Sequence, residues 1–237
     1  MIVIGVAGME KQSDIIGMLR KIFSKAQKRV NIIESCDFQA LTAKNRTNQV
    51  EWESSMRSKT SDDSLTMQQY VEELRKNKSE IVIIKILPQL LESQGYCHID
   101  FDIIVYSSSE NEENSDKNHL AKLFQCMTKE SIALVNIDDE NVFDILNHSV
   151  MSVVTYGMGS KATITASSIS DEETEHSTLI ICLQRNLPVV GADNLEPEEF
   201  PVTIKSSGTD TVYNALAAVT TSLICGITEK SLEEILL

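Results

Sequence analysis

The first residues of the chain, MIVIGVAGMEKQSDIIGML, have the order of elements in which a phosphate-binding loop is found. A buried strand runs into a turn with Gly5 and Gly8, and an amphipathic helix follows, whose first backbone N–H groups would face an anion. The signature of such a loop is G-x-x-x-x-G-K-[ST]. From Gly8 the chain reads GMEKQSD, without a second glycine or a lysine in the required place. The pattern predicts either a nucleotide site or the remains of one.

The elements that would position this turn alternate between strand and helix. Short apolar runs predict strands at 1–6, 30–33, 80–87, 101–106, 131–137 and 152–156. Apolar residues three or four positions apart predict helices near 15–26, 67–74, 120–127, 142–146 and 212–223. Strands separated by helices of this length imply an α/β fold, with a mostly parallel sheet flanked by helices. This arrangement is typical of a P-loop-like mononucleotide-binding fold.

The pattern changes after Gly159. Three β-rich segments, ATITASSI, STLIICL and FPVTIK, follow one another with polar turns and no helix between them. We therefore expect a small antiparallel β-sheet subdomain over about 158–207, within a single domain that spans 1–237.

Composition excludes several classes of function. The chain has 21 basic and 35 acidic residues, a formal net charge of -14 and a pI near 4.7, which argue against binding to nucleic acid or to anionic membrane. Five cysteines without a C-x-x-C pair suggest reduced thiols rather than a zinc site or a disulfide framework. With no basic leader and no apolar run long enough to span a membrane, we expect a cytoplasmic protein.

No catalytic motif is present outside the first turn. The four histidines are scattered, and the chain contains no H-x-x-x-H, H-E-x-x-H or G-x-S-x-G. We therefore predict no catalytic residue and no metal ligand.

Several phrases in order resemble the central domain of the Mur ligases, which are ATP-dependent amide ligases acting on muramyl peptides. The phrases are GVAGMEKQSDIIGML from Gly5, SDDSLTMQQYVEEL, FDIIVYSSSE, ALVNIDDENVFDIL, TYG and GTDTVYNALAAV. The resemblance implies a central ATPase domain with a mostly parallel sheet and a small antiparallel sheet beside it. It also leads us to expect that the N- and C-terminal domains of the family are absent.

The resemblance also implies where the chemistry should lie. The family loop G-T-N-G-K-T-T corresponds to Gly8 through Asp14, so that Gln12 stands where the family has its phosphate-binding lysine. Lys85 stands where the family has a glutamate that binds Mg²⁺, and Leu120 where many members have a carbamylated lysine. All three changes remove groups that handle phosphate or Mg²⁺.

Two interpretations of the loop remain. In one, Lys11 replaces the lysine from one position earlier and Ser13 offers its hydroxyl to Mg²⁺. In the other, Ser13 or Asp14 simply caps the first helix, which requires no ligand.

The phrases NIDD and VYNALAA preserve Asn136, Asp138, Asp139 and Asn214. In the family these regions lie near adenine and ribose, which makes Asn136, Asp139 and Asn214, with Gly8, Lys11, Gln12 and Ser13, the candidate nucleotide-binding residues. The alternative is local: NIDD is a strand-end turn in which Asp138 or Asp139 caps the next helix, and Asn214 bonds to backbone.

Three hypotheses follow. The first is a non-catalytic relative, a pseudo-ligase without a cofactor, that binds a protein partner, a second copy of itself or a cell-wall precursor. The second is a Mg²⁺-ATP-dependent amide ligase, or one subunit of a split ligase. The third is a module that binds nucleotide without hydrolysing it.

Overall fold

A computed structural model describes residues 1–8, 11–34, 67–86, 96–107, 121–125, 127–140, 142–146, 150–159, 161–171, 176–205 and 208–233. Leu120 and the polar segments at 35–62 and 108–119 lie outside these ranges. None of the helices in the described ranges is long and apolar enough to cross a membrane.

Nine strands of the described chain form one sheet in the order β11-β8-β7-β6-β5-β4-β1-β3-β2. Six neighbouring strands of this sheet, β6-β5-β4-β1-β3-β2, pair in parallel, as the alternating pattern predicted. The strands are β1 Ile2–Ala7, β2 Val30–Ile33, β3 Ile81–Ile86, β4 Ile103–Tyr106, β5 Ile132–Asn136, β6 Ser152–Tyr156, β7 Ile164–Asp171, β8 Ser177–Leu183, β9 Leu187–Val189, β10 Ala192–Leu195 and β11 Glu198–Ile204.

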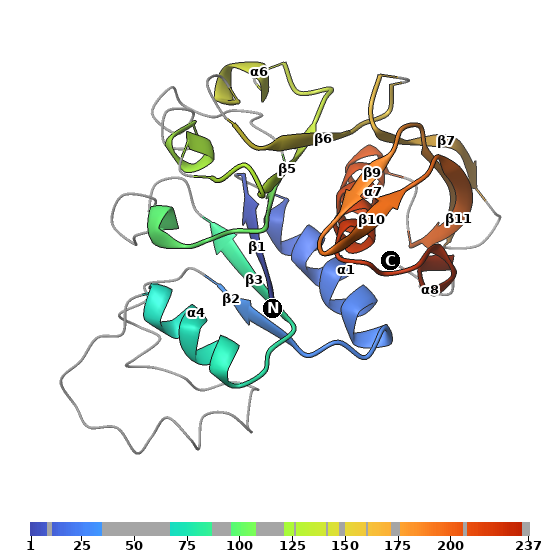
Figure 1. The fold of residues 1–237 in the computed structure, drawn as a ribbon. Coiled ribbons are helices and arrows are strands. Elements are labelled where there is room, and N and C mark those ends of the chain that lie inside the picture. The colour runs from blue at the N-terminus through green and yellow to red at the C-terminus, as the bar shows by residue number, and fades with distance from the viewer. Residues whose placement is uncertain are drawn as a thin grey trace.

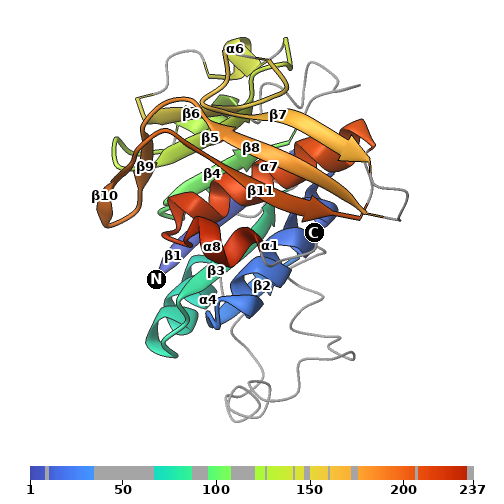
Figure 2. The ribbon, with the colours of Figure 1, turned by 90° about the vertical axis from the view of Figure 1, so that its right-hand side faces the viewer.

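The antiparallel strands continue the parallel sheet. β7 joins β6 through a single parallel pair, Tyr156 with Ile164, and then pairs antiparallel with β8, which pairs antiparallel with β11. A separate two-stranded sheet, β9 with β10, was not predicted from the sequence. The mixed α/β architecture is confirmed, and the β-rich segments after Gly159 form the edge of the main sheet (Figure 2).

Helices cover both faces of the sheet (Figures 1 and 2). They are α1 Gln12–Lys25, α4 Met67–Lys76, the 3₁₀ turn η2 Tyr96–His98, α6 Val142–Ile145, α7 Thr209–Ile224 and α8 Glu229–Glu233, and residues 121–125 are also helical. α1, α7 and α8 pack on one face, and α4 packs on the other with residues 121–125 and the start of α6.

The strand period of two divides the apolar side chains between these two cores. In β1, Ile4 and Val6 belong to the core under α1 and α7, whereas Val3 and Ala7 belong to the core under α4. α1 contributes Ile15, Leu19 and the residues one turn later, which share one face of the helix. Burial on both faces fixes the position of β1, and therefore of the turn that follows it.

Candidate nucleotide site

The candidate site lies where the carboxyl ends of β1, β3, β4, β5 and β6 meet the amino ends of α1 and α7 (Figure 1). Ligands of open α/β sheets bind at this edge, because the loops there are positioned by rigid strands. We call it the carboxyl edge. Gly8 follows β1 and has a φ of 136°, a conformation that favours glycine.

Gln12, which stands in place of the lysine, points into the protein. Its side chain is only 1% exposed, and Nε2 donates 2.6 Å hydrogen bonds to the backbone carbonyls of Gly8 and Ile86. The amide therefore joins the turn after β1 to the end of β3. Among the described residues, its Oε1 atom has no hydrogen-bond partner. A side chain used in this way does not reach toward a phosphate outside the turn.

Lys85 and Ser13 contact each other directly. The Lys85 ammonium donates a 2.9 Å hydrogen bond to the Ser13 hydroxyl. The resemblance assigns these two positions to the ligands of Mg²⁺, which prefers oxygen ligands, several of them carboxylates. In this chain the positive charge next to the Ser13 hydroxyl is the ammonium group of Lys85, where the resemblance would place Mg²⁺.

Lys11 forms an ion pair with a residue of α7. Its ammonium lies 2.6 Å from the Asp210 carboxylate in the first turn of α7, with side chains 19% and 69% exposed. Exposed pairs of this kind contribute about 1 kcal/mol or less. The pair joins the amino ends of α1 and α7 and engages the ammonium that was the candidate replacement for the missing lysine.

The start of α1 corrects one interpretation. Ser13 and Asp14 do not cap this helix, because it begins at Gln12 and both residues lie inside it. Lys11 occupies the capping position and makes no side-chain capping hydrogen bond. Taken together, the contacts of Gln12, Ser13 and Lys85 do not fit Mg²⁺-bound ATP. Leu120, the third altered position, lies outside the described residues.

The NIDD phrase forms a turn at the end of β5. The Oδ1 atom of Asn136 accepts a 3.0 Å hydrogen bond from the backbone N–H of Asp138, and Asn136 is 7% exposed. Asp138 was a candidate helix cap, but its carboxylate turns elsewhere: Oδ2 accepts from the Met158 N–H at 2.7 Å and from the Tyr213 hydroxyl at 2.9 Å. Asp139 follows in the same turn, where its N–H donates to the Asn136 carbonyl at 3.3 Å.

The TYG phrase supports this turn from β6. Tyr156 is buried, and its hydroxyl donates to the carbonyls of Tyr106 and Ser107 at the end of β4, at 3.1 and 3.2 Å. Burial, and then the charge of Asp139, raise the pKa of Tyr156, so the hydroxyl stays a donor. At Gly157 an added Cβ would lie 2.6 Å from Oδ2 of Asp138, which only glycine avoids.

α7 connects the two halves of the carboxyl edge. Asp210 contacts Lys11 at the loop, and one turn later Tyr213 contacts Asp138. Asn214, next in the chain, is 4% exposed on the buried side of α7. The structure thus brings the candidate residues to one edge in two groups, with Asn214 on α7; the groups are Gly8 with Lys11, Gln12 and Ser13, and Asn136 with Asp139.

Sequence reasoning missed Tyr156 and Tyr213, whose hydroxyls hold this edge together. The available signal was an aromatic residue with a polar tip in the phrases TYG and VYN, beside a predicted strand end or helix start. No group of three or more His, Cys, Asp or Glu side chains suited to a metal ion occurs in the described part of the chain.

Comparisons with known proteins bear on this arrangement. The family model described as the Mur ligase middle domain matches residues 15–222. The UDP-N-acetylmuramoyl-L-alanyl-D-glutamate–2,6-diaminopimelate ligase of Alkaliphilus metalliredigens is 25% identical over 235 residues, which is 94% of this chain and 42% of that protein.

Solved structures show the same fold. A structure of a UDP-N-acetylmuramoyl-L-alanyl-D-glutamate–2,6-diaminopimelate ligase superposes with a TM-score of 0.72 at 18% identity, covering 99% of this chain and 45% of that one. MurF ligase from Thermotoga maritima in complex with ADP superposes with a TM-score of 0.60 at 11% identity, covering 99% and 48%. The chain spans less than half the length of these relatives. Because the family model matches most of its residues, the chain belongs to the Mur ligase family and corresponds to the middle domain.

Proposed function

We propose that this chain is a non-catalytic Mur ligase middle domain, a pseudo-ligase that acts by binding another molecule. The observation that carries the proposal is the contact between the Lys85 ammonium and the Ser13 hydroxyl, at 2.9 Å. Phosphoryl transfer requires cations and N–H donors directed at the transferred phosphate. In this chain the nearby donors Gln12 and Lys11 bond instead to Gly8, Ile86 and Asp210.

The bound molecule is a protein partner or a cell-wall precursor in this proposal. Exposed apolar side chains near β6 support a protein partner, since Phe143 is 65% exposed and Val150 is 59% exposed. The name of the Alkaliphilus relative supports a precursor, because that protein is named as a ligase of UDP-N-acetylmuramoyl-L-alanyl-D-glutamate. A role in cell-wall biogenesis accommodates both.

A second candidate function is an ATP-dependent amide ligase, or one subunit of a split ligase that uses Mg²⁺-ATP. Two findings support this alternative. The relatives are named as ligases, and the Thermotoga structure is a complex with ADP. Under this alternative, residues from another chain complete the site.

The two functions are separated by calorimetric titration with ATP and ADP, with and without Mg²⁺. For the natural chain we expect no Mg²⁺-dependent heat and no phosphate release at nucleotide concentrations of ~1 mM. A dissociation constant of ~1 mM corresponds to a binding free energy of about −4 kcal/mol, and we expect any binding to be weaker than this. Mg²⁺-dependent binding by the natural chain would contradict the pseudo-ligase and favour the ligase.

Restoring variants make the negative result interpretable. The double variant Gln12→Lys with Lys85→Glu returns a phosphate-binding cation and a metal-binding carboxylate, so we expect weak, Mg²⁺-dependent ATP binding. Lys85→Met with Gln12→Lys is the matched control, because it removes the ammonium without adding a metal ligand. Metal-independent adenosine binding that weakens in Asn214→Ala would instead indicate the nucleotide module.

A further inference from the structure

A cavity lies at the edge of the sheet opposite the carboxyl edge, beside the amino ends of β1 and β3. Its volume is about 530 Å³. Four cationic side chains, Lys28, Arg29, Arg75 and Lys78, line it together with a single carboxylate, Glu80. The lining is therefore strongly cationic in a chain whose formal net charge is -14. We call this place the basic cavity.

Two helix ends deliver these residues. α1 ends with hydrogen bonds from Gln27 N–H to Ser24 and from Lys28 N–H to Phe23, and Gln27 has φ of 56°. α4 ends in the same way, with Lys78 N–H bonded to Arg75 and a φ of 60° at Lys78. This left-handed position normally carries glycine, and a residue with a side chain there is strained.

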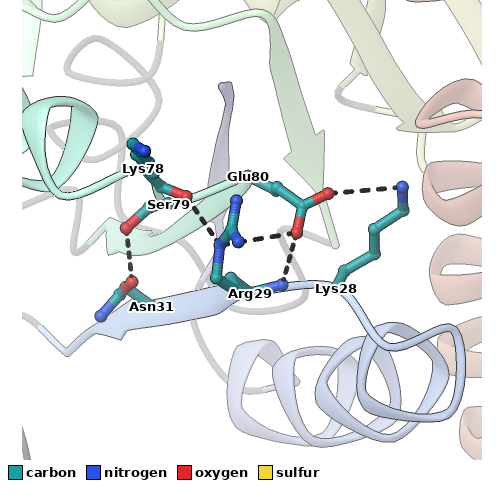
Figure 3. A network of polar contacts seen from close by, with 6 residues as sticks. All are labelled: Lys28, Arg29, Asn31, Lys78, Ser79 and Glu80. Carbon is teal, nitrogen blue, oxygen red and sulfur yellow. Dashed lines mark hydrogen bonds and ion pairs between the residues drawn. The ribbon is translucent and has the colours of Figure 1, made fainter.

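The two connections are fastened to each other (Figure 3). Arg29 donates from its backbone N–H to the Glu80 carboxylate at 3.1 Å and from Nε to the Lys78 carbonyl at 2.8 Å. The N–H groups of Glu80 and Ile81 donate in turn to the Arg29 carbonyl, at 3.0 and 3.1 Å. The basic cavity is therefore held in place before any ligand arrives.

One carboxylate serves two of the cations. Lys28 Nζ and Arg29 Nε lie 3.6 and 3.8 Å from the Glu80 carboxylate. Arg75 lies 3.4 Å from Glu72, which is outside the lining. The backbone hydrogen bond from Arg29 has the largest influence on the pKa of Glu80 and lowers it; burial opposes this, and the charges of Lys28 and Arg29 lower the pKa further. Glu80 and Glu72 together offset two of the four positive charges in the lining, so two remain.

Apolar residues also line the cavity. Ile2, Ile81 and Cys225 contribute to the lining beside the cations. A cavity lined by cations and by apolar side chains suits a ligand that has an anionic part and an organic part, and its volume is in the range of small-molecule sites, about 300–1,000 Å³.

We propose that the basic cavity binds a small molecule carrying two or more phosphate groups. Arginine binds phosphate through two parallel N–H groups, and two arginines and two lysines around one cavity offer several such contacts. The bound phosphates balance the charges that Glu80 and Glu72 leave uncompensated, and the organic part of the ligand lies against Ile2. This site is at the edge of the sheet opposite Gln12 and does not depend on the function proposed for that edge.

The test is a calorimetric titration of the chain with inorganic pyrophosphate at low ionic strength, with Lys78→Gly and Gln27→Gly as a matched pair. Both variants place glycine at a left-handed position, so both should raise the melting temperature. Only Lys78→Gly removes a charge from the lining, and we expect it to weaken pyrophosphate binding about fivefold. Gln27→Gly should leave the affinity unchanged, and Arg75→Gln should weaken it like Lys78→Gly.

Four results would overturn the proposal. Absence of saturable binding would mean that the cations only compensate the carboxyl ends of α1 and α4. Equal losses in Lys78→Gly and Gln27→Gly would indicate an indirect effect. A loss in Lys85→Met, with none in Lys78→Gly, would place the phosphate at the carboxyl edge. Equal affinity for citrate would remove the preference for phosphate.

Discussion

The two edges of one sheet use their cations differently. At the carboxyl edge, Lys11 and Lys85 contact Asp210 and Ser13 at 2.6 and 2.9 Å, each in another element of the chain. At the amino edge, Lys28 and Arg29 share Glu80 at 3.6 and 3.8 Å and line a cavity of about 530 Å³. The lysines at the edge where the fold family binds nucleotide have the shorter contacts, whereas at the amino edge the short side-chain contact belongs to Arg29, whose Nε donates to the Lys78 carbonyl at 2.8 Å.

The difference lies in the partners of the cations and not only in their charge. A lysine with a short internal contact has its position fixed and has one donor fewer for a ligand, whereas a lysine at an open cavity with longer contacts can turn toward one. The carboxyl edge is also braced by buried polar groups such as Gln12 and Tyr156. Substitutions that remove these buried polar groups should lower the free energy of unfolding, whereas substitutions in the basic cavity should lower its affinity for phosphate ligands.

The largest expected effect is at Gly157. In Gly157→Ala the new Cβ lies 2.6 Å from Oδ2 of Asp138 and 2.9 Å from Cγ2 of Ile137, so the carboxylate must leave its bonds to Met158 and Tyr213. We expect a loss of about 2–3 kcal/mol in the free energy of unfolding, measured with denaturant. Gly159→Ala is the control, because its nearest contact is an ordinary 3.6 Å and it should change little. Similar losses in both would contradict the tight turn.

A smaller effect is expected at Gln12. Gln12→Leu has nearly the same volume but leaves the carbonyls of Gly8 and Ile86 without their donor. We expect a loss of about 1–2 kcal/mol, because the leucine also removes the buried Oε1 atom that lacks a partner. Ser13→Ala, one residue along and exposed, should cost less than about 0.5 kcal/mol. If Gln12→Leu is neutral, the amide does not brace this edge.

Most of the sheet could be predicted because its signals are local. The apolar runs at Ile81–Ile86 and Ile132–Asn136 are strands at nearly the predicted positions, since burial on both faces requires continuous apolar sequence. β9 was missed because it is three residues long and contains Pro188. The continuity of β7 with β6 was missed because it depends on one residue pair, Tyr156 with Ile164.

The candidate site was only partly predictable, for a different reason. The replacement of the family's lysine by Gln12 is visible in the sequence. The direction of the Gln12 side chain is not, because it depends on the Ile86 carbonyl, 74 residues away. The basic cavity follows no motif, since Lys28 and Lys78 line one cavity only once the connections that follow α1 and α4 meet beside β2 and β3.

The smallest expected effect is at a carboxyl group on β11, away from both edges of the sheet. Burial, and then the hydrogen bond and charge of Glu229, raise the pKa of Glu198 on β11 to about 7 from 4.5. Between these values the unfolded chain has lost a proton that the folded chain keeps, so the free energy of unfolding should fall as pH rises. Because Glu198 is only partly buried and solvent screens its charge, we expect a change of only a few tenths of a kcal/mol.

Glu198→Gln should remove this pH dependence, measured as unfolding curves from pH 5 to 8. The variant should also be slightly more stable than the natural chain at pH 8, where the natural Glu198 is ionised beside Glu229. If instead the pH dependence persists in Glu198→Gln, another group titrates in this range. The stability measured for variants at either edge would then have to be compared at one fixed pH before the two edges could be contrasted.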